Sequence, residues 1–203
     1  SAFVIDGDTE GMSLNPPEKK MGWCGSDTRS VFFKDMHIPT SAVLGNPSKG
    51  FKQFLKTLTG GRITIGALGL GTAQGAFARA LEYSQEREAF GKSINNFQGV
   101  SFKLSDMATQ IEASRHLVYH AAWKKDQGLP VTREAAMAKL FSSETAMKVT
   151  TEAIQVFGGY GYIKEYDVER FFRDAKILEI GEGTSEVQRM IIAKDLIQSV
   201  QTV

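Results

Sequence analysis

Gly181-Glu182-Gly183-Thr184-Ser185-Glu186 places one carboxylate between two glycines, immediately before a segment patterned as a helix. Glycine permits backbone angles that other residues resist, and it lets a ligand approach the main chain closely. Thr184 is a suitable N-cap, and apolar side chains then recur at helical spacing, which predicts a helix over 184–201. These residues alone leave two readings of Glu182, a solvated turn residue or an acid presented to a ligand.

The segments before this motif are also patterned as helices. Apolar periodicity predicts long helices over 50–87, 98–127 and 132–157, and a short helix over 167–174. Gly128-Leu129-Pro130 is a typical helix stop. With the final segment, four long helices joined by short connections predict an antiparallel four-helix bundle, so the fold class is mainly α.

A small β-region precedes the bundle. Phe3-Val4-Ile5, followed by the turn signal Asp6-Gly7-Asp8, and Val31-Phe32-Phe33 are predicted strands. Gly45-Asn46-Pro47-Ser48 is a predicted linker. The sequence therefore predicts a partial β-domain over 1–47 and a helical domain over 48–203, and a chain that begins inside a strand is expected to be a fragment.

The first long helix is unusually rich in glycine. Six glycines lie between positions 60 and 75, and each costs about 1 kcal/mol relative to alanine inside a helix. We expect them to allow the close approach of another helix or a ligand. The run from Gly69 to Gly75 resembles a dinucleotide-binding loop, but such a loop follows a strand, so helix packing is the favoured interpretation.

The bulk composition narrows the function classes. Lys plus Arg number 24 and Asp plus Glu 23, giving a net charge of +1 and no reason to expect nucleic acid as a partner. The longest uncharged run, 63–78, is too short and too polar for a membrane span. Cys24 is the only cysteine, and His116 and His120 share a helix face without an evident third ligand, so no metal site is expected.

Two loops at the ends of predicted helices carry a second candidate site. Arg87 to Gly91, followed by Phe97-Gln98, is either an ordinary connector or a site that holds a diphosphate and covers an aromatic cofactor. Gln155 to Tyr162 contains three glycines among aromatic residues. This segment is either a helix C-cap or a backbone wall against a flat ligand.

Taken together, these motifs resemble the C-terminal part of the acyl-CoA dehydrogenase family. The resemblance covers essentially the whole chain and includes Lys20-Met21-Gly22, Gly61-Arg62-Ile63, Arg87 to Gly91, residues 134–139, Gly158 to Tyr162, Glu165-Tyr166, Val168-Glu169-Arg170 and the block from Arg173 to Arg189. It implies the end of the family's middle β-domain and its entire C-terminal helical domain, without the N-terminal helical domain.

The resemblance implies a flavin-dependent reaction. Members of the family use FAD to oxidise the Cα–Cβ bond of an acyl-CoA thioester to a trans-2-enoyl-CoA. Glu182 would be the base that removes the Cα proton, a step that suits a carboxylate fixed near the carbon. The thioester oxygen then needs donors already in place, and the family uses the backbone N–H of the base.

The remaining site residues are also carried over from the resemblance. Arg62, Gly183 and Lys194 would face the substrate, with Lys194 at the CoA end. The FAD would contact Arg87, Phe90, Gln98, Gln155, Gly158 and Gly159 from across a subunit interface, and Thr184 and Glu186 from its own subunit. Some members place the base just before the arginine of the first bundle helix, a position that here is Gly61.

The same resemblance implies partners and leaves other functions open. It implies an electron-transfer flavoprotein or similar acceptor, a homodimer or homotetramer, and a bacterial cytoplasmic or mitochondrial matrix enzyme that is not secreted. An acyl-CoA oxidase would carry much the same motifs. Because part of the expected enzyme is missing, the isolated chain is expected to be inactive, and a cofactor-free helical oligomerisation module is the competing description.

Overall fold

The computed structural model describes residues 1–200 and divides the chain into two compact units, Ser1–Leu58 and a unit that starts at Thr59. The predicted domain boundary after residue 47 stays a prediction. In the first unit, β1 (Met12–Leu14) pairs antiparallel with β2 (Val31–Phe33), in a register that places Ser13 opposite Phe32. Two 3₁₀ turns follow, η1 (Thr40–Ala42) and η2 (Pro47–Lys49).

One strand prediction in this unit was wrong and another strand was missed. The predicted strand at Phe3-Val4-Ile5 is a single bridge between Phe3 and Val43. It cannot extend because η1 bends the partner segment just before Val43. The strand at Val31-Phe32-Phe33 is confirmed, but its partner β1 had no apolar run to reveal it.

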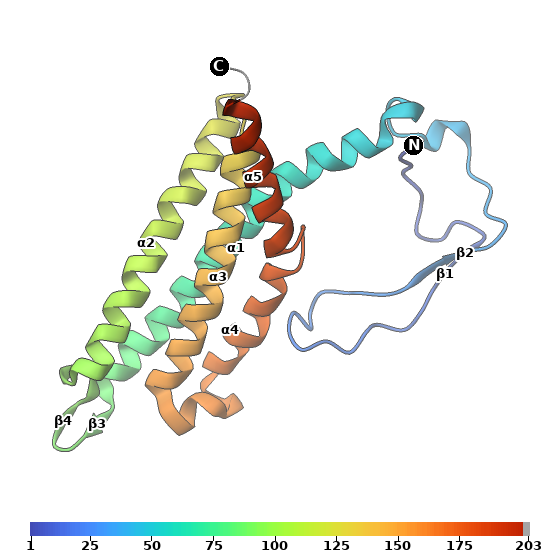
Figure 1. The fold of residues 1–203 in the computed structure, drawn as a ribbon. Helices are drawn as coiled ribbons and strands as arrows, with labels where there is room; N and C mark the ends of the chain where they lie inside the picture. The colour runs from blue at the N-terminus through green and yellow to red at the C-terminus, as the bar shows by residue number, and fades with distance from the viewer. Residues whose placement is uncertain (201–203) are drawn as a thin grey trace. The chain divides into compact units, whose positions relative to one another are not determined.

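The helical unit confirms the predicted bundle, with helix ends within two residues of those expected, except that the predicted end of the last helix at residue 201 lies outside the described residues. Its helices are α1 (Gly50–Glu86), which begins in the first unit, α2 (Gln98–Asp126), α3 (Thr132–Phe157), α4 (Val168–Ala175) and α5 (Ser185–Val200). Helix α3 is central, since it contacts α2, α4 and α5, and Figure 1 shows it between α2 and α5. A hairpin of β3 (Glu88–Ala89) and β4 (Lys92–Ser93), which the sequence did not predict, joins α1 to α2.

The glycines of α1 bring its backbone onto α3. A Cβ built on Gly66 would lie 3.3 Å from the carbonyl oxygen of Ala138, and one built on Gly69 would lie 2.9 Å from that of Ser142. The expected close approach of another helix is therefore confirmed. Residues 69–75 lie inside α1, so they are not a nucleotide-binding loop. Small buried side chains continue the contact between helices, among them Ala73, Ala76, Ala135 and Ala138.

Among the described residues, no helix is long and apolar enough to cross a membrane. The same residues contain no group of three or more His, Cys, Asp or Glu side chains arranged to hold a metal ion.

The helix contact yields a matched pair of glycine substitutions. We expect Gly69→Ala to lower the free energy of unfolding by about 1–3 kcal/mol, because the added methyl group meets the α3 backbone. Gly71→Ala is the control, since nothing lies within 4 Å of its Cβ position, and it should gain about 0.5–1 kcal/mol from helix propensity. Urea unfolding measures both, and a gain in stability for both variants would contradict the close contact.

A second expectation concerns stability in acid. Arg173 donates two hydrogen bonds to the carboxylate of Glu169 on α4, at 2.5 and 3.0 Å, and this holds the pKa of Glu169 below its ordinary value. A pKa lowered by folding adds stability above the unfolded-state value of about 4.3, and that stability is lost as the pH falls through the folded-state value.

Glu169→Gln should therefore cost about 0.5–1 kcal/mol at pH 7 and close to nothing at pH 3. Urea unfolding at both pH values is the measurement. Glu165→Gln serves as the control, because its exposed side chain makes no ion pair within residues 1–200. An equal cost for Glu169→Gln at the two pH values would show that the ion pair does not contribute.

Candidate active site

The Glu182 carboxylate lies directly against helix α1. A Cβ built on Gly61 would lie 2.5 Å from Oε2 of Glu182 and 3.1 Å from its Cδ. The glycine therefore provides the space that the carboxylate occupies. Two residues far apart in the sequence meet here, in agreement with the family resemblance, which places Arg62 near Glu182.

The loop that carries Glu182 has a specialised backbone. It connects η6 (Lys176–Glu179) to α5, and both Glu182 (φ 56°) and Gly183 (φ 91°) adopt left-handed angles. A non-glycine residue in this region is uncommon and is often found at functional sites. The geometry turns the main chain sharply and leaves the Glu182 side chain exposed at the bend.

A buried glutamine, which sequence reasoning missed, fixes this loop. Gln188 is fully buried, and its Nε2 donates hydrogen bonds to the carbonyl oxygens of Gly183 at 2.8 Å and Glu182 at 3.3 Å. Thr184 confirms its predicted capping role, because its Oγ1 accepts a hydrogen bond from the N–H of Val187 at 3.3 Å. The turn that carries Glu182 is thus anchored to the first turns of α5.

Two buried cations lie on α1 and α3. Arg62, one residue after Gly61, is 6% exposed; burial lowers its pKa from the ordinary value, and the charge of Glu182 opposes that shift. Lys139 on α3 is completely buried, and its charge interacts with those of Arg62 and Glu186. Sequence reasoning missed Lys139. The feature that could have revealed its burial is its position among small residues on the inner face of α3, since Ala135, Ala138 and Ser142 are also buried.

Glu186 lies in the first turn of α5, close to Thr184, and is exposed. Hydrogen bonds from its own backbone N–H and from the Thr184 side chain lower its pKa. Lys194 is exposed ten residues beyond Thr184 on the same helix, about 15 Å along its axis. The structure therefore gathers Arg62, Glu182, Gly183, Thr184 and Glu186, and places Lys194 at a distance from them.

The second group of predicted residues surrounds a separate pocket. Arg87, Gly158 and Gly159 line a cavity of about 480 Å³ together with Tyr83 and Phe157. The Arg87 guanidinium lies 5.7 Å from the centre of the Tyr160 ring. Nothing lies within 4 Å of a Cβ built on either glycine, so the backbone is open to a flat ligand. This combination of a cation, an aromatic wall and bare backbone fits a dinucleotide cofactor.

The other predicted cofactor residues lie beside this pocket without lining it. Phe90 is 96% exposed at the tip of the β3–β4 hairpin, with φ 52°, and its ring meets Phe97 edge-on at 6.0 Å. Gln98 begins α2, and Gln155 lies in the last turn of α3; both are exposed. The residues around Glu182 and the residues around the second pocket lie far apart along α3. Lys139 and Gly158, which mark the two places, are nineteen residues apart, about 28 Å along the helix.

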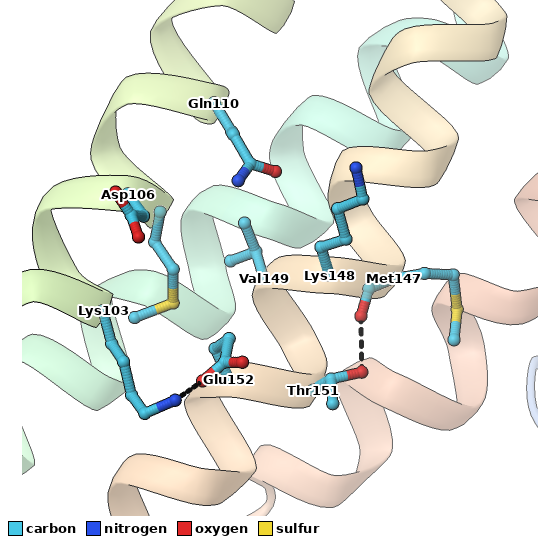
Figure 2. Close-up of a pocket in the computed structure, with 9 residues that line it drawn as sticks. Lys103, Asp106, Gln110, Met147, Lys148, Val149, Thr151 and Glu152 are labelled. Atoms are coloured by element: carbon cyan, nitrogen blue, oxygen red, sulfur yellow. Dashed lines mark hydrogen bonds and ion pairs between the residues drawn. The ribbon is translucent and has the colours of Figure 1, made fainter. Parts of the chain in front are cut away.

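Another pocket, of about 410 Å³, lies between α2 and α3 and holds none of the predicted site residues (Figure 2). An ion pair between Lys103 and Glu152 crosses it, and Lys148 stands at its edge. It carries no arrangement of nucleophile and base, and we assign it no role in chemistry.

Comparison with known proteins identifies the family to which this fold belongs. The family model described as "Acyl-CoA dehydrogenase, C-terminal domain" matches residues 48–197. The chain belongs to the acyl-CoA dehydrogenase family. It is 50% identical over 193 residues to a short-chain-specific acyl-CoA dehydrogenase of Clostridium acetobutylicum, a match that covers 95% of this chain and 51% of the relative.

Solved structures of the acyl-CoA dehydrogenase family have the same architecture. Butyryl-CoA dehydrogenase from Megasphaera elsdenii matches with a TM-score of 0.94 and 50% identity, covering 96% of this chain and 51% of the other. A chain solved in work on the electron transferring flavoprotein of Acidaminococcus fermentans matches with a TM-score of 0.94, 48% identity and the same coverage. The chain thus spans about half the length of the relatives it matches.

The contact between Gly61 and Glu182 can be tested without any assay of activity. A normal contact needs about 3.5 Å, so the methyl group of Gly61→Ala should displace the Glu182 carboxylate by about 1 Å. Because that carboxylate ends a flexible, exposed side chain, the contact should add little cost, and Gly61→Ala should gain about 0.5–1 kcal/mol from helix propensity, as Gly71→Ala does. A crystal structure and urea unfolding of the variant measure the two effects, and Gly71→Ala should leave the carboxylate in place.

Proposed function

We propose that this chain is the C-terminal half of an FAD-dependent acyl-CoA dehydrogenase in which Glu182 removes the α-proton of an acyl-CoA thioester. The placement of the Glu182 carboxylate carries the proposal. It projects from a bend held by Gln188 and Thr184, against the rigid helix α1. A carboxylate on such a support is suited to act as a general base at a fixed carbon atom.

The first unit supports the proposal that the chain is part of a longer enzyme. Among its described apolar side chains only Ala2 is buried, and Phe32, Phe33 and Phe51 are each more than half exposed. A β-unit of this size needs a second layer to bury such side chains. The half-length coverage of the relatives agrees with this reading.

The residues present also fit the FAD cofactor of the family. Arg87 would pair with its diphosphate, and Gly158 and Gly159 would offer open backbone in the pocket that they line. Thr184 and Glu186 stand beside the proposed base. Arg87, Gly158 and Gly159 lie around the other pocket, at the C-terminal end of α3. This separation supports the expectation that the two groups serve cofactors of different subunits in a dimer or tetramer. When bound, FAD supplies an acceptor for the hydride from Cβ.

This chain's own residues would then perform the proton chemistry. The substrate would lie against Gly183, whose left-handed backbone angle turns the main chain directly after Glu182. Glu182 takes the Cα proton, and the backbone N–H of the same residue donates to the thioester oxygen as negative charge develops there. Arg62 adds a buried positive charge beside the site, and the negative charge of Glu182 opposes the lowering of the Arg62 pKa by burial.

The relatives suggest the substrate class and the acceptor. The Clostridium acetobutylicum and Megasphaera elsdenii relatives are named for short-chain and butyryl substrates, so we propose a short acyl chain. The match to a chain solved with an electron transferring flavoprotein supports such a flavoprotein as the electron acceptor.

The test is turnover of the intact enzyme with a panel of acyl-CoA thioesters, beginning with butyryl-CoA, and an artificial electron acceptor. Glu182→Gln should retain the flavin absorbance bands near about 370 and 450 nm while turnover falls by at least ~10²-fold. Glu82→Gln, an exposed acid on α1, is the matched control and should retain turnover. Near-normal turnover by Glu182→Gln would refute the assignment of the base.

The same measurements separate the competing functions. Oxygen consumption without an added acceptor would indicate an acyl-CoA oxidase. Absence of the flavin bands from the intact protein would favour a cofactor-free helical module.

A further inference from the structure

Lys139 stands out because its charge is buried without a hydrogen bond. The side chain is 0% exposed, and its Nζ has no hydrogen-bond partner within residues 1–200. A buried ammonium group is unfavourable unless it is paired, because it loses its hydration. A lysine in such a place is therefore kept against a cost in stability, which points to a role other than packing.

Helix α1 packs closely against α3 at Lys139. A Cβ on Gly66 of α1 would lie 3.4 Å from the backbone nitrogen of Lys139, so α1 presses on α3 at this residue. Helix α3 contacts both η6 and α5, and the charged groups that act on Lys139 come from these two elements, from α1 and from α3 itself. They are Glu179 of η6, Glu186 of α5, Arg62 of α1 and Glu144 of α3 itself. Burial lowers the pKa of Lys139, and Glu179 and then Glu186 are the strongest opposing influences.

The two main counter-charges flank the proposed base. Glu179 is three residues before Glu182 and Glu186 is four residues after it. Glu179 also pairs with Lys176 at 2.5 Å on the outer side of the loop. One buried cation on α3 thus attracts both ends of the segment that carries Glu182.

We propose that Lys139 is a positioning residue, whose buried charge holds both ends of segment 179–186 toward α3 and so keeps the Glu182 carboxylate at Gly61. The inference rests on the proposed role of Glu182 for its kinetic consequence, whereas the effect on the loop is independent of that role. Methionine has a similar length and would fill the same space without charge. Lys139→Met therefore separates the charge from the packing.

The first measurement is amide hydrogen exchange in the intact enzyme. We expect Lys139→Met to speed exchange across 179–186 by at least ~10-fold, because that segment opens more often without its buried counter-charge. Lys148→Met is the matched control on the same helix, since Lys148 is exposed, and it should leave exchange there unchanged (Figure 2). Unchanged exchange across 179–186 in Lys139→Met would overturn the inference.

The second measurement combines kinetics with thermal unfolding. In Lys139→Met, kcat should fall at least ~10-fold, since even a small displacement of a catalytic group is costly, while KM changes by less than ~3-fold. Flavin content should be retained, and Tm should be equal or higher, because an apolar side chain replaces a buried charge. A parallel fall of Tm, flavin content and kcat would show a packing role and overturn the proposal.

These outcomes distinguish failure of the inference from failure of the proposed function. If the unaltered enzyme turned over no acyl-CoA, the proposed function would fail, and the exchange measurement would still decide the role of Lys139. Should Lys139→Met not fold, Glu179→Gln removes one counter-charge from the loop side. It should also speed exchange around Glu182, and unchanged exchange would overturn the proposal.

Discussion

The close approach of α1 to α3 is the constraint on which the site depends. Gly66 and Gly69 let the two backbones touch, and no larger residue fits at Gly69 without moving the Ser142 carbonyl. This contact fixes the rotation and height of α1 in the bundle. It thereby fixes Gly61 and Arg62, which lie one to two turns earlier on the same helix. The glycines lower the helix propensity of α1, and the packing that they permit compensates for it.

A second consequence of this contact is electrostatic. Because α1 and α3 exclude water between them, Arg62 and Lys139 hold positive charge in a poorly solvated region. The loop above them carries Glu179, Glu182 and Glu186, so the two parts of the site attract one another strongly. The fold thus places its unfavourable buried charges beside the segment that carries Glu182. This is the pattern expected when stability is exchanged for function.

The sequence predicted the helices well and the contacts between them poorly. Helix ends were predictable because their signals are local, as with Gly128, whose φ of 68° ends α2. Strand pairing is not local, so β1 was missed and Phe3 was assigned to a strand that is only a bridge. The roles of Gln188 and Lys139 were missed for the same reason, since both depend on what lies across the bundle. The family resemblance supplied Glu182, but it did not supply the neighbours that hold it.

The position of Gly61 explains why a base can come from either of two elements. In the family, some members are expected to carry the base just before the arginine of the first bundle helix, which is position 61 here. The Glu182 carboxylate lies where a side chain at that position would begin, with Oε2 only 2.5 Å from the Cβ site. Acids at both positions would clash, and two carboxylates so close could not both ionise. A carboxylate that keeps this position on the loop therefore requires a residue without a side chain at position 61. Gly61 is thus part of the proposed active site although it contributes no reacting atom.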